Sequence, residues 1–92
     1  MNLSTRDELT FVQLQRMKKP KIGEPTIDLT IILKGSQLLM NNCTLGNLKE
    51  YCLMCNVRYL QTESGENYYP KELNDEIFIT LASRRLLPII AS

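Results

Sequence analysis

Two groups of side chains have types and spacings that could support chemistry. Cys52 and Cys55 form a Cys-x-x-Cys pair, the spacing of thiol redox centres and of half a zinc site. A closed zinc site needs four ligands, and the chain offers only one further cysteine, Cys43, and no histidine. A redox motif usually lies in a βαβ context that is missing here. We therefore interpret the three cysteines as small buried hydrophobic residues.

Acidic side chains gather between residues 72 and 76, where Glu72, Asp75 and Glu76 could supply paired carboxylates. They stand in a polar stretch beside the start of an expected strand, where solvated loop charges are the usual case. The absence of histidine excludes Ser–His and Cys–His pairs, and no Gly-rich phosphate loop is present. The sequence therefore predicts that the protein is not an enzyme and uses no metal and no catalytic cofactor.

The elements that position these groups are expected to be mainly strands. Apolar residues alternate with others over residues 27–33, and again over residues 76–82, which predicts two strands with one apolar face each. Residues 44–57 fit two patterns. Leu48, Tyr51, Cys52 and Cys55 have helical spacing behind a capping Thr44, but the end of this segment also alternates as a strand does. The sequence alone leaves this segment undecided.

Length and charge limit the classes of protein that are possible. The chain of 92 residues is expected to form a single domain, 1–92, and its net charge of +1 provides no strong attraction for nucleic acid. A basic turn rich in Pro and Gly is expected at residues 18–25, and an apolar C-terminal tail outside any strand pattern at residues 84–92. Such a small chain buries little surface alone, so we expect it to form a homodimer.

No apolar run approaches the ~20 residues of a membrane-spanning helix, and no signal peptide is recognisable. We therefore expect synthesis in the cytosol, with reduced cysteines.

Three stretches resemble a known family. Asp7–Met17 (DELTFVQLQRM), Ile31-Ile32-Leu33 followed by Gly35-Ser36-Gln37-Leu38, and Glu72-Leu73-Asn74-Asp75-Glu76 are similar to segments of the 9b-type accessory proteins of SARS-related betacoronaviruses. Those proteins are encoded in an alternative reading frame within the nucleocapsid gene. The likeness extends to about residue 83. The basic turn is shorter than in the family, the cysteines have no counterpart, and the tail extends beyond the usual end.

The resemblance implies an all-β fold: a tent-like, intertwined homodimer of twisted sheets that encloses an apolar cavity and holds a lipid or other long-chain apolar molecule. It implies a viral accessory protein that antagonises interferon signalling of the host. Its partner would be the mitochondrial outer-membrane import receptor. Its location would be the host cytoplasm, peripherally on mitochondrial or other intracellular membranes, and the virion.

Two sets of residues follow from this expectation. The candidate lining of the lipid cavity is Ile27, Leu29, Ile31, Leu33, Val57, Ile77, Ile79 and Leu81. The family's central segment also binds the receptor groove as a helix, and the corresponding residues 35–60 provide the candidate partner-binding set of Ser36, Leu39, Leu45, Leu48, Tyr51, Cys52 and Cys55. Ser36 matches a family serine, whereas Leu39 stands where a second serine would be.

The main alternative is an α+β, ubiquitin-like β-grasp monomer that acts as a protein-interaction adaptor. It takes residues 27–42 as a hairpin, residues 44–57 as a helix across it and residues 76–82 as the returning strand. Such a fold has a solid core and no ligand cavity. A small metal or redox protein is the third alternative.

Overall fold

The hairpin of β1 (Ile27–Leu33) and β2 (Ser36–Cys43) forms one side of the sheet. The computed structural model describes residues 17–33 and 36–90. Ile27, Leu29 and Ile31 are completely buried, as the alternating pattern predicts for a strand with one covered face. Each fully buried side chain of this kind stabilises the fold by about 1.5–3 kcal/mol.

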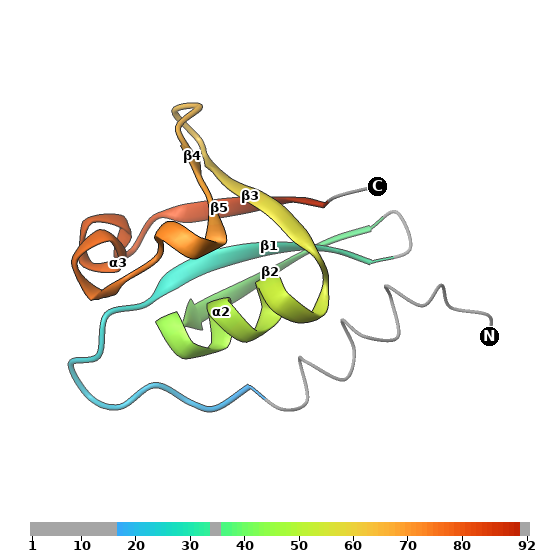
Figure 1. Ribbon diagram of the computed structural model, residues 1–92. Coiled ribbons are helices and arrows are strands. Elements are labelled where there is room, and N and C mark those ends of the chain that lie inside the picture. Colours follow the sequence, from blue (N-terminus) through green and yellow to red (C-terminus); the bar gives the residue numbers. More distant parts are fainter. Residues whose placement is uncertain (1–16, 34–35, 91–92) are drawn as a thin grey trace.

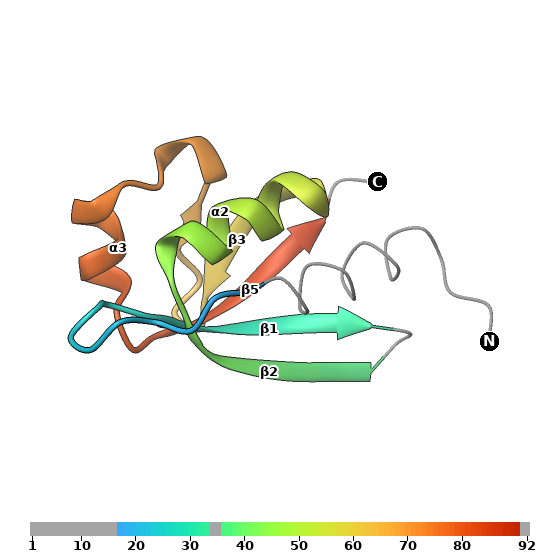
Figure 2. The same cartoon turned by 90° about the horizontal axis from the view of Figure 1, so that it is seen from below.

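Helix α2 (Leu45–Met54) lies across one face of the sheet (Figures 1 and 2). It begins after Thr44, whose hydroxyl accepts a hydrogen bond from the backbone N–H of Asn47 at 3.2 Å. Leu48, Tyr51 and Cys52 are buried, so the helical pattern of this segment wins over the strand pattern. The tertiary contacts of the covered face decide between the two. Asn56 then adopts a φ of +52°, which turns the chain into the next strand.

The second half of the chain adds β3 (Val57–Thr62), β4 (Asn67–Tyr68), the 3-10 helix η1 (Pro70–Glu72) and α3 (Asp75–Leu81). The expected strand over residues 76–82 is therefore wrong. Asn74 caps α3, because its side-chain oxygen accepts the N–H of Ile77 at 2.8 Å. Asp75 and Glu76 lie in the first helical turn, where carboxylates interact favourably with the helix dipole.

Strand β5 (Arg85–Ile90) completes the sheet, so the expectation of a tail at residues 84–92 is wrong for residues 85–90. The strand order is β2-β1-β5-β3-β4, with β5 parallel to β1 and antiparallel to β3. Proline is rare in central strands because it cannot donate to the ladder. Pro88 is tolerated because the pairing with β1 ends at Leu29 and Leu86, while Leu60 of β3 lies opposite the proline.

The sheet-dominated domain is confirmed in its coarse form, and the described residues form a mixed five-stranded sheet with two α-helices. The helices depart from the all-β expectation. The hairpin and the crossing helix of the β-grasp alternative are both present, and its returning strand lies at β5 instead of residues 76–82. The core lies between α2 and the sheet, with Phe78 and Leu81 of α3 also buried. The intertwined dimer and its cavity stay predictions.

Candidate functional site

The three cysteines belong to the core. Cys43, Cys52 and Cys55 form no disulfide and all are buried. Burial, with a smaller contribution from Cys52, raises the pKa of Cys43 to about 12. Burial together with Cys55 likewise raises the pKa of Cys52 to about 12. Both thiols are therefore protonated at neutral pH, which makes them poor nucleophiles. Within residues 17–33 and 36–90, no cluster of three or more His, Cys, Asp or Glu side chains is placed to hold a metal ion.

The carboxylates of residues 72–76 lie at the starts of helices. A side-chain oxygen of Glu72 accepts the backbone N–H of Tyr69 at 3.1 Å, at the start of η1. Asp75 and Glu76 occupy the first turn of α3. All three side chains are exposed. Their arrangement serves the starts of two short helices, and sequence spacing alone does not separate this role from a carboxylate pair.

Most of the candidate lipid-cavity residues pack inside one chain. Ile27, Leu29, Ile31, Val57 and Leu81 are buried in the common core. Ile77 is half-buried against that core, whereas Ile79 on α3 points outward and is 62% exposed. The side chain of Leu33 lies outside the described part of the chain. The structure therefore brings five of these residues together and separates Ile79 from them.

The candidate partner-binding residues divide into two groups. Leu48, Tyr51, Cys52 and Cys55 share the covered side of α2 and are buried, with Leu45 partly buried beside them. Leu39 lies on β2 and is exposed. Ser36 begins β2, and its side chain lies outside the described part. The helical face predicted to enter a receptor groove is thus formed, but it is already covered by the sheet.

The sheet face opposite α2 is the most open surface formed by the central strands. On β5, Leu86 and Pro88 are buried, so Arg85, Leu87 and Ile89 alternate to this outer face. The pairing places Leu87 beside Gln61 and Ile89 beside Tyr59 of β3. The ring of Tyr59 contacts that of Tyr69, with ring centroids 5.8 Å apart. We call the group Tyr59, Gln61, Arg85, Leu87 and Ile89 the outer-face patch.

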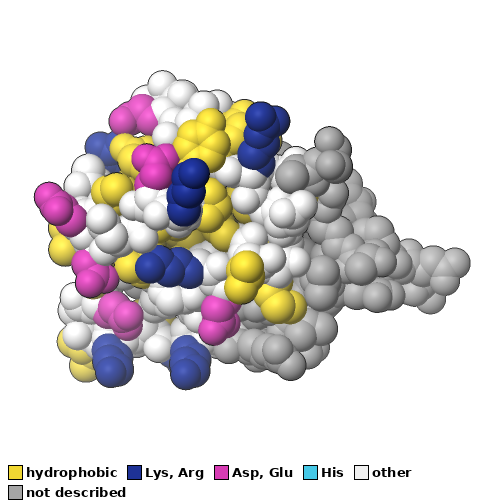
Figure 3. All heavy atoms as spheres, in the orientation of Figure 1, with side chains coloured by type: hydrophobic (Ala, Val, Ile, Leu, Met, Phe, Trp, Pro, Cys, Tyr) yellow, Lys and Arg dark blue, Asp and Glu magenta, His cyan; other side chains and the backbone are white. Residues whose placement is uncertain are grey.

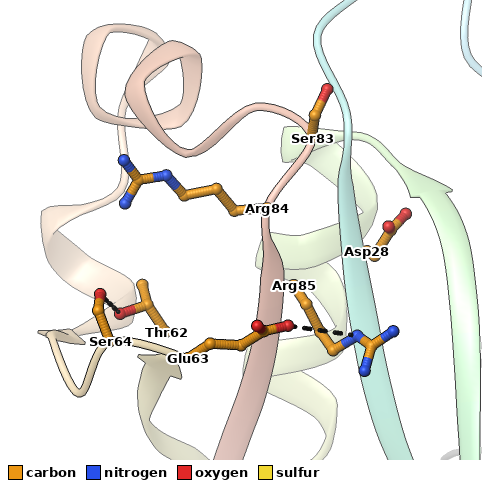
Figure 4. A pocket seen from close by; sticks show the side chains of 7 residues that line it. All are labelled: Asp28, Thr62, Glu63, Ser64, Ser83, Arg84 and Arg85. Carbon is orange, nitrogen blue, oxygen red and sulfur yellow. Dashed lines mark hydrogen bonds and ion pairs between the residues drawn. The ribbon is translucent and has the colours of Figure 1, made fainter.

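Two open hollows adjoin the polar end of this patch. One, of about 390 Å³, is lined in part by Gln61, Arg85 and Leu87. The other, of about 530 Å³, is drawn in Figure 4 and is lined by Asp28, Thr62, Glu63, Ser64, Ser83, Arg84 and Arg85. Thr62, Glu63 and Arg85 line both hollows, so the two are neighbours.

Two arginines dominate the chemistry of these hollows. Arg85 forms an ion pair with Glu63 at 3.7 Å, drawn as a dashed line in Figure 4, and Arg84 pairs with Glu66 at 3.5 Å. Each of these four side chains is at least half exposed. Exposed ion pairs of this kind contribute about 0–1 kcal/mol. A carboxylate brought by a partner can therefore replace either glutamate at small cost.

A second surface lies where the basic turn meets α2. The side-chain oxygen of Asn47 accepts the N–H of Lys18 at 3.3 Å, and its amide nitrogen donates to the carbonyl of Lys18 at 2.8 Å. This double contact fixes the basic turn beside a hollow of about 740 Å³ that Lys18, Lys19 and Lys21 line together with Glu24 and Glu50. The view in Figure 3 shows basic and acidic side chains interspersed among hydrophobic ones. The mixture of signs gives this face no single-sign field.

No family model matches the chain, and searches of curated proteins and of solved structures find no significant match. Among the described helices, none combines the length and the apolar character needed to cross a membrane.

Sequence reasoning missed the outer-face patch because it treated residues 84–92 as a tail. One signal could have found the strand that carries this patch. A short apolar run such as Leu86–Ile90, bounded by turn residues, is typical of a strand buried on both faces in the centre of a sheet.

Proposed function

We propose that this protein is a protein-binding module of the ubiquitin-like β-grasp class. The observation that carries the proposal is the outer-face patch. Leu87 and Ile89 stand on the central strand of the sheet, on the face that α2 leaves open, and each is only half-buried. A rigid sheet that presents apolar side chains around a few polar groups suits recognition of another folded surface or peptide.

The patch also defines the chemistry of its partner. Arg85 stands two residues before Leu87 on the same face, so an apolar contact area has a cation at one end. A matching partner surface carries apolar side chains flanked by a carboxylate. That carboxylate would replace Glu63 on Arg85, and the apolar contacts would supply most of the affinity.

The packing of the core supports a module without an internal ligand. Residues that a lipid would have to separate, such as Leu29, Val57 and Leu81, belong instead to one cluster within a single chain. Opening a chamber between them would remove contacts that a close-packed interior provides. The proposed function therefore places binding on the surface.

The test compares two charged substitutions at isoleucines, the half-buried Ile89 and the exposed Ile79. We expect immobilised Ile89→Glu to lose the proteins that the wild-type chain retains from a cell extract, and Ile79→Glu on α3 to keep them. Native mass spectrometry of the purified protein provides the second measurement, with no fatty-chain adduct expected. A retained set that is insensitive to Ile89→Glu, or a bound lipid, would contradict the proposal. Circular dichroism of both variants controls for folding.

The resemblance to the 9b-type accessory proteins supports a second candidate, a viral antagonist of interferon signalling that binds the mitochondrial import receptor. One observation favours it: the segment expected to enter the receptor groove is a helix, α2. Since Leu48 and Tyr51 face the sheet, the helix must leave the fold before it binds. Apparent affinity then falls by the fraction of molecules that are open.

A peptide spanning residues 35–60 tests this candidate by titration calorimetry against the receptor. We expect the peptide to bind more tightly than the intact protein, and Leu48→Glu to abolish its binding. Leu53→Glu is the matched control, because Leu53 is 85% exposed on the other side of the same helix. Absence of binding by both the peptide and the intact chain would remove this candidate and leave the outer-face patch unaffected.

A further inference from the structure

The two edge strands of the sheet differ in length and in composition. One edge is β4, only two residues long, and the chain folds into η1 directly after it. The other is β2, which spans Ser36–Cys43 and contains no charged residue, proline or glycine. Within the described residues, β1 is the only strand that pairs with β2. Natural sheets usually protect such an edge with charges, prolines or bulges, because its free N–H and C=O groups recruit another strand. The register of β2 against β1 shifts once, between Met40 and Cys43, so the regular part of the edge lies before that shift.

The side chains of β2 reinforce this difference. Leu38 is 49% exposed and Leu39 is 38% exposed. Leu38 lies opposite the buried Ile31, so it belongs to the α2 side of the sheet, while Leu39 lies opposite Thr30 on the outer face. Both faces of the free edge therefore carry an exposed leucine at the same level.

From these features we propose that two copies of the chain pair through β2, in antiparallel orientation, to form one continuous sheet. The proposal concerns an edge that the proposed function does not use. A second copy fits because β2 carries no charge that would select a foreign strand, and because it is complementary to itself in a single register.

The register follows from the alternation of side chains. Directly opposite residues of antiparallel strands point to the same face. A two-fold axis perpendicular to the sheet keeps α2 and its copy on one side, so it must pair outer-face residues with outer-face residues. With the axis at Leu39, this leucine meets its own copy, Leu38 meets Met40, and Gln37 meets Asn41. Apolar side chains then face apolar ones, and amides face amides.

The neighbouring registers are poorer. An axis at Met40 sets Leu39 against Asn41, and an axis at Leu38 sets Leu39 against Gln37. The backbone agrees with the central choice. Asn42 has a φ of +61°, which ends the extended part of β2, and Gln37–Asn41, the residues that the axis at Leu39 pairs, all precede it. This ladder is short, and its buried area falls below that of a standard interface. We therefore expect a reversible dimer with a dissociation constant in roughly the micromolar to millimolar range.

Analytical ultracentrifugation over a range of protein concentrations is the first test. The average mass of the wild-type chain is expected to rise from monomer towards dimer. Leu39→Lys places two like charges on the axis and should keep the chain monomeric throughout. Leu53→Lys, on exposed α2, should dimerise as the wild type does. A monomeric wild type at every concentration, or a Leu39→Lys variant that still dimerises, overturns the proposal.

Disulfide trapping tests the register. Leu39→Cys brings two thiols together on the axis and should give a covalent dimer upon mild oxidation. Gln37→Cys is the matched control, because its own copy lies about four residues away along the strand, roughly 14 Å. The native cysteines are buried and do not compete. Equal cross-linking of the two variants would exclude this register, and a lack of cross-linking by Leu39→Cys would exclude the pairing.

Discussion

The two faces of the central sheet carry residues of similar type but use them differently. Leu86 and Leu87 are neighbours on β5, yet Leu86 is completely buried under the helical layer and Leu87 lies half-exposed on the outer face. Two asparagines, Asn47 on α2 and Asn67 on β4, show the same contrast between a buried and an exposed position. The first is buried and holds the basic turn, and the second accepts an exposed hydrogen bond from Gln61.

This difference shows that position relative to α2, more than residue type, decides which side chains serve stability and which are available for binding. The α2 side holds the chemistry-bearing thiols, and their burial suppresses their reactivity. The outer side has apolar and charged groups in contact with solvent. Binding is therefore expected where the contribution of a side chain to stability is small.

The largest effect is expected from the two leucines of β5. Leu86→Ala removes a buried side chain and should lower the free energy of unfolding by about 2–5 kcal/mol. Leu87→Ala on the outer face should lower it by about 1 kcal/mol or less. Urea unfolding monitored by circular dichroism measures both. Equal losses of unfolding free energy in the two variants would show that the outer face of the sheet is covered to the same extent as the inner face.

The two asparagines provide a smaller contrast. Asn47→Ala leaves the backbone groups of Lys18 without their partner, and we expect it to lower the free energy of unfolding by about 1–3 kcal/mol. Asn67→Ala removes one exposed hydrogen bond and should change it by less than about 0.5 kcal/mol. The same urea titrations serve for this pair. A larger loss for Asn67→Ala would reverse the assignment of roles.

The buried thiols predict a dependence on alkaline pH. Because the pKa values of Cys43 and Cys52 are raised to about 12 in the folded protein, the unfolded chain loses these protons first as the pH rises. Their contribution to stability is complete below about pH 8.5 and is lost as the pH increases towards 12. Near pH 9 the wild type should lose about 1–2 kcal/mol more than a Cys43→Ala, Cys52→Ala double variant does.

Unfolding titrations at neutral pH and near pH 9 measure this difference. Leu53→Ala, which changes an exposed side chain of α2, is the control and should follow the wild type at both values. Parallel losses in the wild type and the double variant would mean that the thiols do not titrate differently in the two states.

The smallest effect is expected at Ile79. This side chain points away from the core, so Ile79→Asp should change the free energy of unfolding by no more than about 0.5 kcal/mol. An obligate β dimer with Ile79 in a shared cavity predicts the opposite, the loss of fold and assembly together. Size-exclusion chromatography and thermal unfolding of this variant decide between the two. If Ile79→Asp fails to fold, a shared cavity in an obligate dimer explains the result better than an exposed Ile79 does.

The sequence predicts β1 well because only one of its faces is covered, which leaves a clear alternation from Ile27 to Ile31. It misleads at residues 76–82, where Ile77, Ile79 and Leu81 alternate by chance within a helix. The buried pair Phe78 and Leu81 has helical spacing instead. Asn74 followed by two acidic residues is a helix start that outweighs a short alternation, and it could have corrected the prediction.

The candidate sites were less accessible to sequence reasoning. Most of the residues predicted to line a cavity, for example Ile27 and Leu81, are buried, whereas Ile79 is exposed, and a pattern does not tell a filled core from a lined chamber. The outer-face patch depends on pairing between strands far apart in the chain, such as Tyr59 with Ile89. Long-range pairing of this kind leaves no local periodicity to read.

The central place of β5 has a consequence for how the protein acquires its structure during translation. This strand is synthesised after all the other described elements, yet it separates β1 from β3 and is the only strand that joins them. The hairpin β1–β2 and the pair β3–β4 can form earlier from local contacts, but each keeps an open inner edge until residues 85–90 have left the ribosome. Joining Asp28 to Arg85 then closes a long loop, which slows folding and prolongs the lifetime of two incomplete half-sheets. The nascent chain is therefore most vulnerable to misassociation and to proteolysis just before β5 is inserted.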